Sequence, residues 1–269
     1  MNKKAREGTM VEQHPPGTPG EAVIVASDLW KSFGPTVALA GFSLEVRRGE
    51  IQVIMGPSGC GKSVLLKHLV GLVKPDRGEV LVFGQPVHAM SEHELDALRI
   101  QIGVVFQSAA LFDSLTVTQN VAFPLRRHRR LTEGEIAERV RDMLALVEMD
   151  GTEDLTPAAL SGGMRKRVGI ARALALDPPL MLYDEPTSGL DPLTAHTVDK
   201  LVLRLRAELG VSSVVVTHSL DSAFHLADRL AVMDSGRLTA SGTPEEILAS
   251  TDPFVRRFLD TRAIEVRAS

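Results

Sequence analysis

The sequence of 269 residues has little of several features that define other protein classes. It contains a single cysteine, Cys60, which excludes an internal disulfide and fits a reducing compartment such as the cytosol. No apolar run approaches the ~20 residues that a helix needs to cross a bilayer. Residues 1–20 are polar and rich in Gly and Pro, so no signal peptide is expected there. If the protein serves a membrane, we expect it to be a peripheral subunit.

The sequence also has no excess of charge and no repetition. The formal net charge is −4, so no basic surplus points to a nucleic-acid partner. Hydrophobic residues make up 44% and charged residues 24%, values that are ordinary for a globular protein with a core. The length suits one large α/β domain or two small ones. Because no internal repeat is found, we expect one nucleotide-binding unit and not a tandem pair.

A complete phosphate-binding loop is present near the N-terminus. Its residues follow the pattern G-x-x-x-x-G-K-S and are Gly56, Pro57, Ser58, Gly59, Cys60, Gly61, Lys62 and Ser63. A mostly apolar strand, 51–55, precedes the loop, and a helix is predicted over 64–70. The glycines allow backbone N–H groups to surround a β-phosphate beside the positive end of that helix. Lys62 would place its charge near the β- and γ-phosphates, and the Ser63 hydroxyl would bind Mg²⁺.

Three further short apolar runs predict parallel strands covered by helices on both faces. They are residues 102–105, 180–183 and 214–216. Residues 42–46 alternate apolar and polar side chains, which predicts a half-buried antiparallel strand. Helix starts are predicted from N-capping residues and first-turn prolines at Thr132, Asp191-Pro192 and Thr243-Pro244. The pattern predicts a nucleotide-binding core with a helical insert at about residues 108–159.

The segment 160–164 reads Leu-Ser-Gly-Gly-Met and is the most distinctive in the chain. Ser161, Gly162 and Gly163 come just before a helix predicted to open at Met164, so their N–H groups and the Ser161 hydroxyl predict a second anion site. With the phosphate loop and an apolar run ending in Tyr-Asp-Glu, this segment closely resembles the ATP-binding cassette (ABC) ATPases. The resemblance covers about residues 22–250. It implies that the signature segment closes over ATP held by a second copy of the chain.

The resemblance also implies a fold and a domain organisation. The expected fold is α/β, with a P-loop NTPase (RecA-like) core, an antiparallel β subdomain and an inserted α-helical subdomain. Residues 1–21 are expected to form a disordered N-terminal arm. Residues 22–250 are expected to form the ABC ATPase domain, and residues 251–269 a C-terminal tail helix.

Residues that follow the predicted strands match further motifs of this family. Asp184 would hold Mg²⁺, mostly through water, and Glu185 would be the general base for the attacking water. Gln107 matches the Q-loop glutamine, which can reach Mg²⁺ or the attacking water; an exposed loop glutamine is the alternative. His218 matches the switch histidine, whose ring would hydrogen-bond the γ-phosphate; a structural histidine is the alternative. Phe33 lies where the family places an aromatic residue against adenine, and a core Phe is the alternative.

The signature helix, 160–172, has Met164 where most family members have Gln. In this it resembles the ATPase subunits of the Mla (maintenance of lipid asymmetry) and MCE-associated phospholipid transporters. Segments 106–112, 120–125 and 252–260 fit the same group. The resemblance implies two ATPase copies, an integral membrane permease, an MCE-type lipid-binding protein and in some cases a small regulatory subunit. The location implied is the cytoplasmic face of a bacterial inner (cell) membrane.

Two other functions fit part of the sequence. The ATPase of a polar amino-acid importer shares every catalytic motif, and a permease of another type would identify it. A non-transport cassette protein would act in DNA maintenance, ribosome rescue or iron–sulfur assembly. The first of these roles needs long coiled coils and the second usually needs two cassettes, and the sequence has neither.

Two features, a basic run and an apolar stripe in the tail, each have two possible interpretations. The basic run 126–130 could meet anionic headgroups or an acidic loop, although such runs are more often solvated faces. In the tail, Phe254, Val255, Phe258 and Leu259 share one side of a predicted helix. That apolar stripe could pack on the chain's own core or dock onto the second ATPase or a regulatory subunit.

Overall fold

The computed structural model describes residues 20–268, with side chains described to residue 260. Residues 1–19 of the predicted N-terminal arm lie outside this range. A four-stranded antiparallel sheet has the order β2-β1-β4-β5. Its strands are β1 (Ala22–Phe33), β2 (Thr36–Arg47), β4 (Arg77–Val82) and β5 (Gln85–Pro86). The strand predicted at 42–46 is confirmed as part of β2, where buried and exposed residues alternate.

The second sheet has six strands in the order β10-β9-β3-β8-β7-β6. Its strands are β3 (Ile51–Met55), β6 (Ile102–Val105), β7 (Leu180–Asp184), β8 (Ser212–Thr217), β9 (Arg229–Asp234) and β10 (Arg237–Gly242). All neighbours pair in parallel except β9 and β10. The four short strands predicted around the motifs are therefore confirmed, and their carboxyl ends lie at one edge of the sheet.

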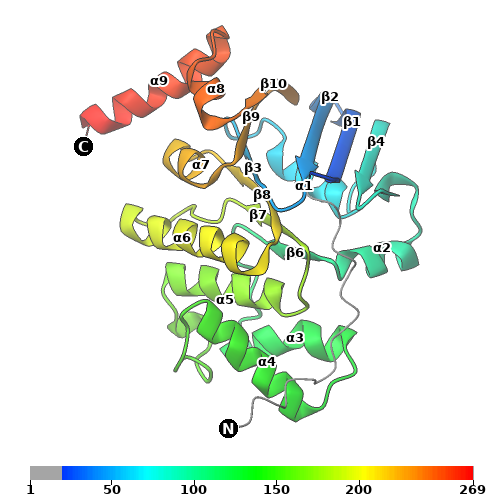
Figure 1. The fold of residues 1–269 in the computed structure, drawn as a ribbon, viewed down its shortest axis with the longest axis vertical. Helices are drawn as coiled ribbons and strands as arrows, with labels where there is room; N and C mark the ends of the chain where they lie inside the picture. The colour runs from blue at the N-terminus through cyan, green and yellow to red at the C-terminus, as the bar shows by residue number, and fades with distance from the viewer. Residues whose placement is uncertain (1–19, 269) are drawn as a thin grey trace.

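Helices cover both faces of the six-stranded sheet and form a separate group at one end of the molecule (Figure 1). The helices are α1 (Lys62–Leu69), α2 (Glu92–Arg99), α3 (Val117–His128), α4 (Glu133–Leu146), α5 (Gly162–Leu174), α6 (Pro192–Leu209), α7 (Leu220–Leu226), α8 (Pro244–Leu248) and α9 (Pro253–Ala268). The predicted N-caps Thr132, Asp191 and Thr243 are confirmed. Within residues 20–268, no helix is both long and apolar enough to cross a membrane.

The α-helices α3 and α4 lie within the predicted insert and pack against α5, at the opposite end from the antiparallel sheet (Figure 1). Two arginines of the basic run 126–130 make contacts between the helices of this group or the residues that follow them. Arg126 Nη2 lies 2.6 Å from Glu133 Oε2, and Arg129 Nη2 donates to the carbonyl oxygen of Leu176 at 2.9 Å. The solvated-face interpretation therefore describes only part of the run.

Two hydrophobic clusters lie on the two faces of the six-stranded sheet. Along β7, Met181 and Tyr183 belong to one cluster, and Leu180 and Leu182 belong to the other. Both sets are fully buried, which explains why this strand reads as a continuous apolar run and not as an alternating one. The second cluster also contains the inward side chains of the antiparallel sheet, so the two sheets share a core.

The tail helix α9 packs its apolar stripe on the chain's own core. Val255 is fully buried within the larger cluster, and Phe254, Phe258 and Leu259 are partly buried against it. The rings of Phe254 and Phe258 stack with their centroids 6.0 Å apart. In the structure, the apolar stripe therefore packs on the chain's own core.

Candidate nucleotide site

The phosphate loop joins β3 to α1 and is shaped by glycines in close contact with other strands. Gly61 has φ +110°, and a Cβ there would lie 2.3 Å from the carbonyl oxygen of Ala38. A Cβ on Gly56 would lie 2.1 Å from the carbonyl oxygen of Met233. Only glycine fits either position without moving the backbone. The loop is thus held by β2 and by the end of β9.

The first turn of α1 is open to an anion. Gly61 is the N-cap and provides no side-chain hydrogen bond to the first N–H groups of the helix. The helix starts at Lys62, two residues before the predicted start, so Lys62 and Ser63 stand in that first turn. Unpartnered N–H groups at a helix start, with the positive end of the helix dipole, suit a phosphate group.

The ammonium group of Lys62 lies inside the loop. Its Nζ donates to the carbonyl oxygens of Gly56 at 2.7 Å and Pro57 at 3.0 Å. The side chain is buried, and Cys60 Sγ lies 3.9 Å from Nζ. The loop therefore brings together the predicted phosphate donors and one positive charge.

Ser63 and Asp184 provide two oxygen atoms that can face a cation. The Ser63 hydroxyl donates to Asp184 Oδ1 at 2.9 Å, which links α1 to the end of β7. Burial raises the pKa of the Asp184 carboxyl, while the Ser63 hydrogen bond and the charges of Lys62 and Lys67 oppose that rise. Mg²⁺ in nucleotide sites uses one or two protein oxygen ligands together with phosphates and water. This pair fits that requirement.

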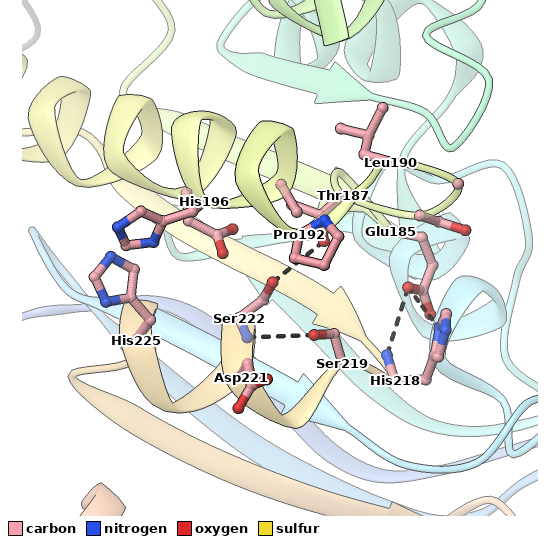
Figure 2. Close-up of a pocket in the computed structure, with 14 residues that line it drawn as sticks. Glu185, Thr187, Leu190, Pro192, His196, His218, Ser219, Asp221, Ser222 and His225 are labelled. Carbon is pink, nitrogen blue, oxygen red and sulfur yellow. Dashed lines mark hydrogen bonds and ion pairs between the residues drawn. The ribbon is translucent and has the colours of Figure 1, made fainter. Parts of the chain in front are cut away.

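Glu185 and His218 meet at the adjacent ends of β7 and β8 (Figure 2). Glu185 Oε2 lies 2.9 Å from His218 Nδ1 and 3.4 Å from the His218 backbone N. The Glu185 side chain is 12% exposed, whereas that of His218 is 54% exposed. The structure thus brings together two residues that were singled out separately in the sequence. His218 is not a buried structural histidine.

Gln107 points toward the loop after β7. Its Nε2 donates to Ser188 Oγ at 3.2 Å. Ser188, Glu185 and His218 also line a pocket of about 500 Å³ that extends along α6 and α7 (Figure 2). For Gln107 to reach Mg²⁺ or the attacking water as predicted, its amide must leave Ser188.

The signature segment forms the start of α5. Ser161 is the N-cap, and its Oγ accepts from the Met164 N–H at 3.2 Å. The helix opens at Gly162, two residues before the predicted start at Met164. A Cβ on Gly163 would lie 2.4 Å from Thr194 Cγ2. Both glycines therefore lie in the first turn of α5. At Gly163 a side chain is excluded, because α5 packs closely on the start of α6 there.

Phe33 is at the end of β1 and is 49% exposed. The core alternative for this residue is therefore wrong. Lys31 Nζ lies 5.6 Å from the centroid of the Phe33 ring. The role against adenine stays a prediction.

Sequence reasoning missed Lys166 in α5. This lysine is buried, and its Nζ lies 2.6 Å from the carbonyl oxygen of Gln107 and 3.0 Å from that of Glu185. Its partners are main-chain atoms of distant loops, so no local motif marks them. The only sequence signal is a lysine at an inward position of a helix whose neighbouring inward residues are small or apolar.

Comparisons with known proteins agree on one family. The profile described as "ABC transporter" matches residues 39–188. The chain is 41% identical over 248 residues to "Probable ribonucleotide transport ATP-binding protein mkl" of Mycobacterium tuberculosis, covering 92% of this chain and 69% of that protein. It is 40% identical over 226 residues to "Intermembrane phospholipid transport system ATP-binding protein MlaF" of Haemophilus influenzae, covering 84% and 86%.

A third relative has another named substrate. "Methionine import ATP-binding protein MetN" of Rhizobium johnstonii is 41% identical over 242 residues, covering 90% of this chain and 67% of that protein. Among solved structures, a dimeric post-hydrolysis state of the ATP-binding cassette MJ0796 bound to ADP and Pi is similar with a TM-score of 0.76. It is 34% identical and covers 82% of this chain and 98% of that one.

Proposed function

This chain belongs to the ABC transporter family of ATP-hydrolysing cassettes, and we propose that two copies of it power an integral membrane permease that moves phospholipids or other lipids. The proposed ATPase chemistry rests on the contact between the Glu185 carboxylate and His218. Glu185 directly follows Asp184, which accepts a hydrogen bond from Ser63. The lipid substrate is supported by the 40% identity to the phospholipid transport ATPase over 86% of its length.

Each side chain of the site has one proposed task. Lys62 would neutralise charge on the β- and γ-phosphates of ATP. Ser63 and Asp184 would hold Mg²⁺, which when bound adds to that neutralisation. Glu185 would accept a proton from the water whose oxygen attacks the γ-phosphorus, while the bond to the β–γ bridging oxygen breaks to give ADP and phosphate. His218 would hold the Glu185 carboxylate in place through Nδ1.

We propose that each active site is shared between two copies. In this scheme the anion-binding start of α5, with Ser161 as its N-cap, faces the γ-phosphate held by the partner's phosphate loop. The dimeric cassette with 34% identity supports this arrangement. The adenine contact of Phe33 belongs to the same proposal, since an aromatic ring exposed at the end of β1 can stack on a base.

Mixed dimers test the shared site. Ser161→Arg blocks the signature and Lys62→Ala removes the phosphate charge, so either variant alone should be inactive. A dimer containing one of each has one intact site, and we expect partial recovery of ATPase activity on mixing. Verified mixed dimers that stay inactive, beside an active wild-type control, would count against sharing.

Exposed aromatic side chains are proposed to bind the permease: Phe106, which precedes Gln107 in the chain, and the pair Phe112 and Phe123. Phe106, Phe112 and Phe123 are each more than 40% exposed, and the rings of Phe112 and Phe123 lie 4.7 Å apart. Arg172 lies over the Phe112 ring at 5.7 Å. Clustered exposed aromatic residues are typical of protein interfaces. Such a surface favours a transport subunit over a non-transport cassette protein.

The substrate is tested with the membrane protein that co-purifies with this chain. After reconstitution in liposomes, phospholipid movement should require ATP and stop in Glu185→Gln. The same complex tests the proposed MCE-type protein and regulatory subunit, which should co-purify with it. The identity to the methionine import protein defines the competing result. ATPase activity that responds to a polar amino acid and its binding protein, with no lipid movement, would overturn the lipid proposal.

Met164 gives weaker support to the same subgroup. It is partly buried and packs against the larger hydrophobic cluster. An apolar side chain suits that position, whereas the Gln found in most of the family would place an amide there.

A further inference from the structure

Lys166 is a charged side chain in a buried position that the proposed chemistry does not use. It is 5% exposed and is the fifth residue of α5 after the N-cap Ser161. Burial lowers the pKa of its ammonium group, and the charges of Glu185 and Asp184 oppose that change. A buried ammonium group is unfavourable unless several acceptors compensate it. Its acceptors therefore indicate why a lysine is present.

Two carbonyl oxygens from two different loops accept hydrogen bonds from Lys166. Nζ lies 2.6 Å from the Gln107 oxygen, in the loop after β6, and 3.0 Å from the Glu185 oxygen, in the loop after β7. The same Glu185 oxygen accepts from the Ser188 N–H at 3.2 Å. Ser188 Oγ in turn accepts from Gln107 Nε2 at 3.2 Å. Lys166, Gln107, Ser188 and Glu185 thus form a closed circuit of four hydrogen bonds.

The circuit holds Glu185 in an unusual backbone conformation. Its φ is +50°, in the left-handed region that residues with a Cβ rarely adopt. The Glu185 N–H donates to the Val216 oxygen at 3.0 Å, and its carbonyl oxygen is held by Ser188 and Lys166. Since the main chain sets the direction of Cα–Cβ, these bonds fix where the Glu185 side chain starts, and its carboxylate reaches His218 from there.

We propose that Lys166 is a positioning residue for ATP hydrolysis, which fixes the main chain of Glu185 and of Gln107 from the helix that begins with the signature segment. The proposal rests on the proposed role of Glu185 as general base. Because Lys166 and Ser161 share one helix, a shift of α5 when its first turn meets a partner's nucleotide would act directly on both loops. Lysine suits this task because its ammonium group is a point donor with three hydrogens, whereas the planar guanidinium of arginine favours paired acceptors.

The test replaces Lys166 with Met, which fills a similar volume without charge or donors, in the full chain. Lys200→Met is the matched control, since Lys200 is an exposed lysine on the adjacent helix α6. We expect Lys166→Met to lower kcat by about 10- to 100-fold, the scale for a misplaced catalytic group. ATP affinity and the melting temperature should stay near wild type, because the residues placed around the phosphates are unchanged. Lys200→Met should change none of these quantities.

Two further variants separate positioning from a structural role. Lys166→Arg keeps the charge and should recover part of the lost kcat. Adding Lys166→Met to Glu185→Gln should cause little further loss, since residues acting through one another are non-additive. A fall in melting temperature and ATP affinity in parallel with kcat, in both Lys166 variants, would overturn the positioning role.

The failures of the two proposals are distinguishable. If Glu185→Gln retains near-normal turnover, the general-base proposal fails and the inference fails with it. If Glu185→Gln is inactive while Lys166→Met has normal kcat, only the inference about Lys166 fails.

Discussion

The Glu185 carboxylate accepts a hydrogen bond from the imidazole of His218, with Oε2 2.9 Å from Nδ1. A neutral histidine has one N–H, so donation to Glu185 through Nδ1 leaves Nε2 as an acceptor. Only a doubly protonated ring can donate to Glu185 and to a γ-phosphate together. For the γ-phosphate contact predicted from the sequence to form with a neutral ring, His218 would have to turn its N–H from Glu185 to the phosphate.

Glu185 and Lys62 are expected to fail in different ways. Glu185→Gln keeps the size of the side chain but removes the base, so turnover should fall about 10²- to 10⁴-fold, the usual scale for general-base loss. ATP binding should persist and favour an ATP-bound dimer. Lys62→Ala should weaken ATP binding and hydrolysis together, because it removes the charge inside the loop. Nucleotide-binding titrations and steady-state ATPase assays distinguish the two, and near-normal turnover by Glu185→Gln would remove it from the base role.

Asp184 is expected to reduce the stability of the nucleotide-free protein. Burial raises the pKa of its carboxyl, so the folded protein holds this proton more tightly than the unfolded chain does. The free energy of unfolding should therefore rise as pH falls through the raised pKa, as far as this group is concerned. Asp184→Asn should melt at a higher temperature than wild type at pH 7.5, and the gain should shrink toward acid pH.

The matched control is Asp142→Asn, at an exposed position on α4. It should leave both the melting temperature and its pH dependence close to wild type. Asp184→Asn should also lose Mg²⁺-dependent hydrolysis. The residue that destabilises the nucleotide-free protein would then be one that the proposed metal site requires. A lower melting temperature for Asp184→Asn at neutral pH would contradict the sign of this argument.

Much of the fold follows from local patterns, whereas part of the site does not. Strands β3 and β6 can be predicted from their apolar runs. Both faces of the sheet are covered, so nearly every residue of these strands is buried. Lys166 could not be recognised, since a lysine in a helix normally indicates an exposed position. Likewise, the packing of Gly163 on Thr194 depends on the tertiary approach of α6 to α5. Contacts between distant loops leave no periodic signal in the sequence.

Cys60 allows the phosphate loop to be probed with a thiol reagent. The thiol is buried, and burial raises its pKa, against the opposing charge of Lys62. Alkylation of the native protein should therefore be slow at neutral pH and accelerate at alkaline pH, because the thiolate is the reactive form. ATP should slow it further, and the modified protein should lose nucleotide binding. As the chain has one cysteine, mass spectrometry gives the modified fraction directly. Full activity after complete alkylation would refute the steric argument.

The tail helix gives the last prediction. Phe254 and Phe258 stack on each other and cover the larger core beside the fully buried Val255. Replacing both phenylalanines with Ala should lower the free energy of unfolding by ~2 kcal/mol or more, less per residue than the 3–5 kcal/mol for a fully buried Phe because both are partly exposed. Thermal and denaturant unfolding of the full chain measure this.

Arg256→Ala with Arg257→Ala is the matched control, because these side chains are exposed on the other side of the same helix. The pair should leave stability nearly unchanged, so a loss confined to the phenylalanine variant identifies packing and not helix propensity. Docking on a second ATPase or a regulatory subunit predicts the reverse outcome, in which the phenylalanine variant melts normally but assembles poorly. Since the stripe already has an apolar partner in its own chain, early melting with normal assembly is the expected result.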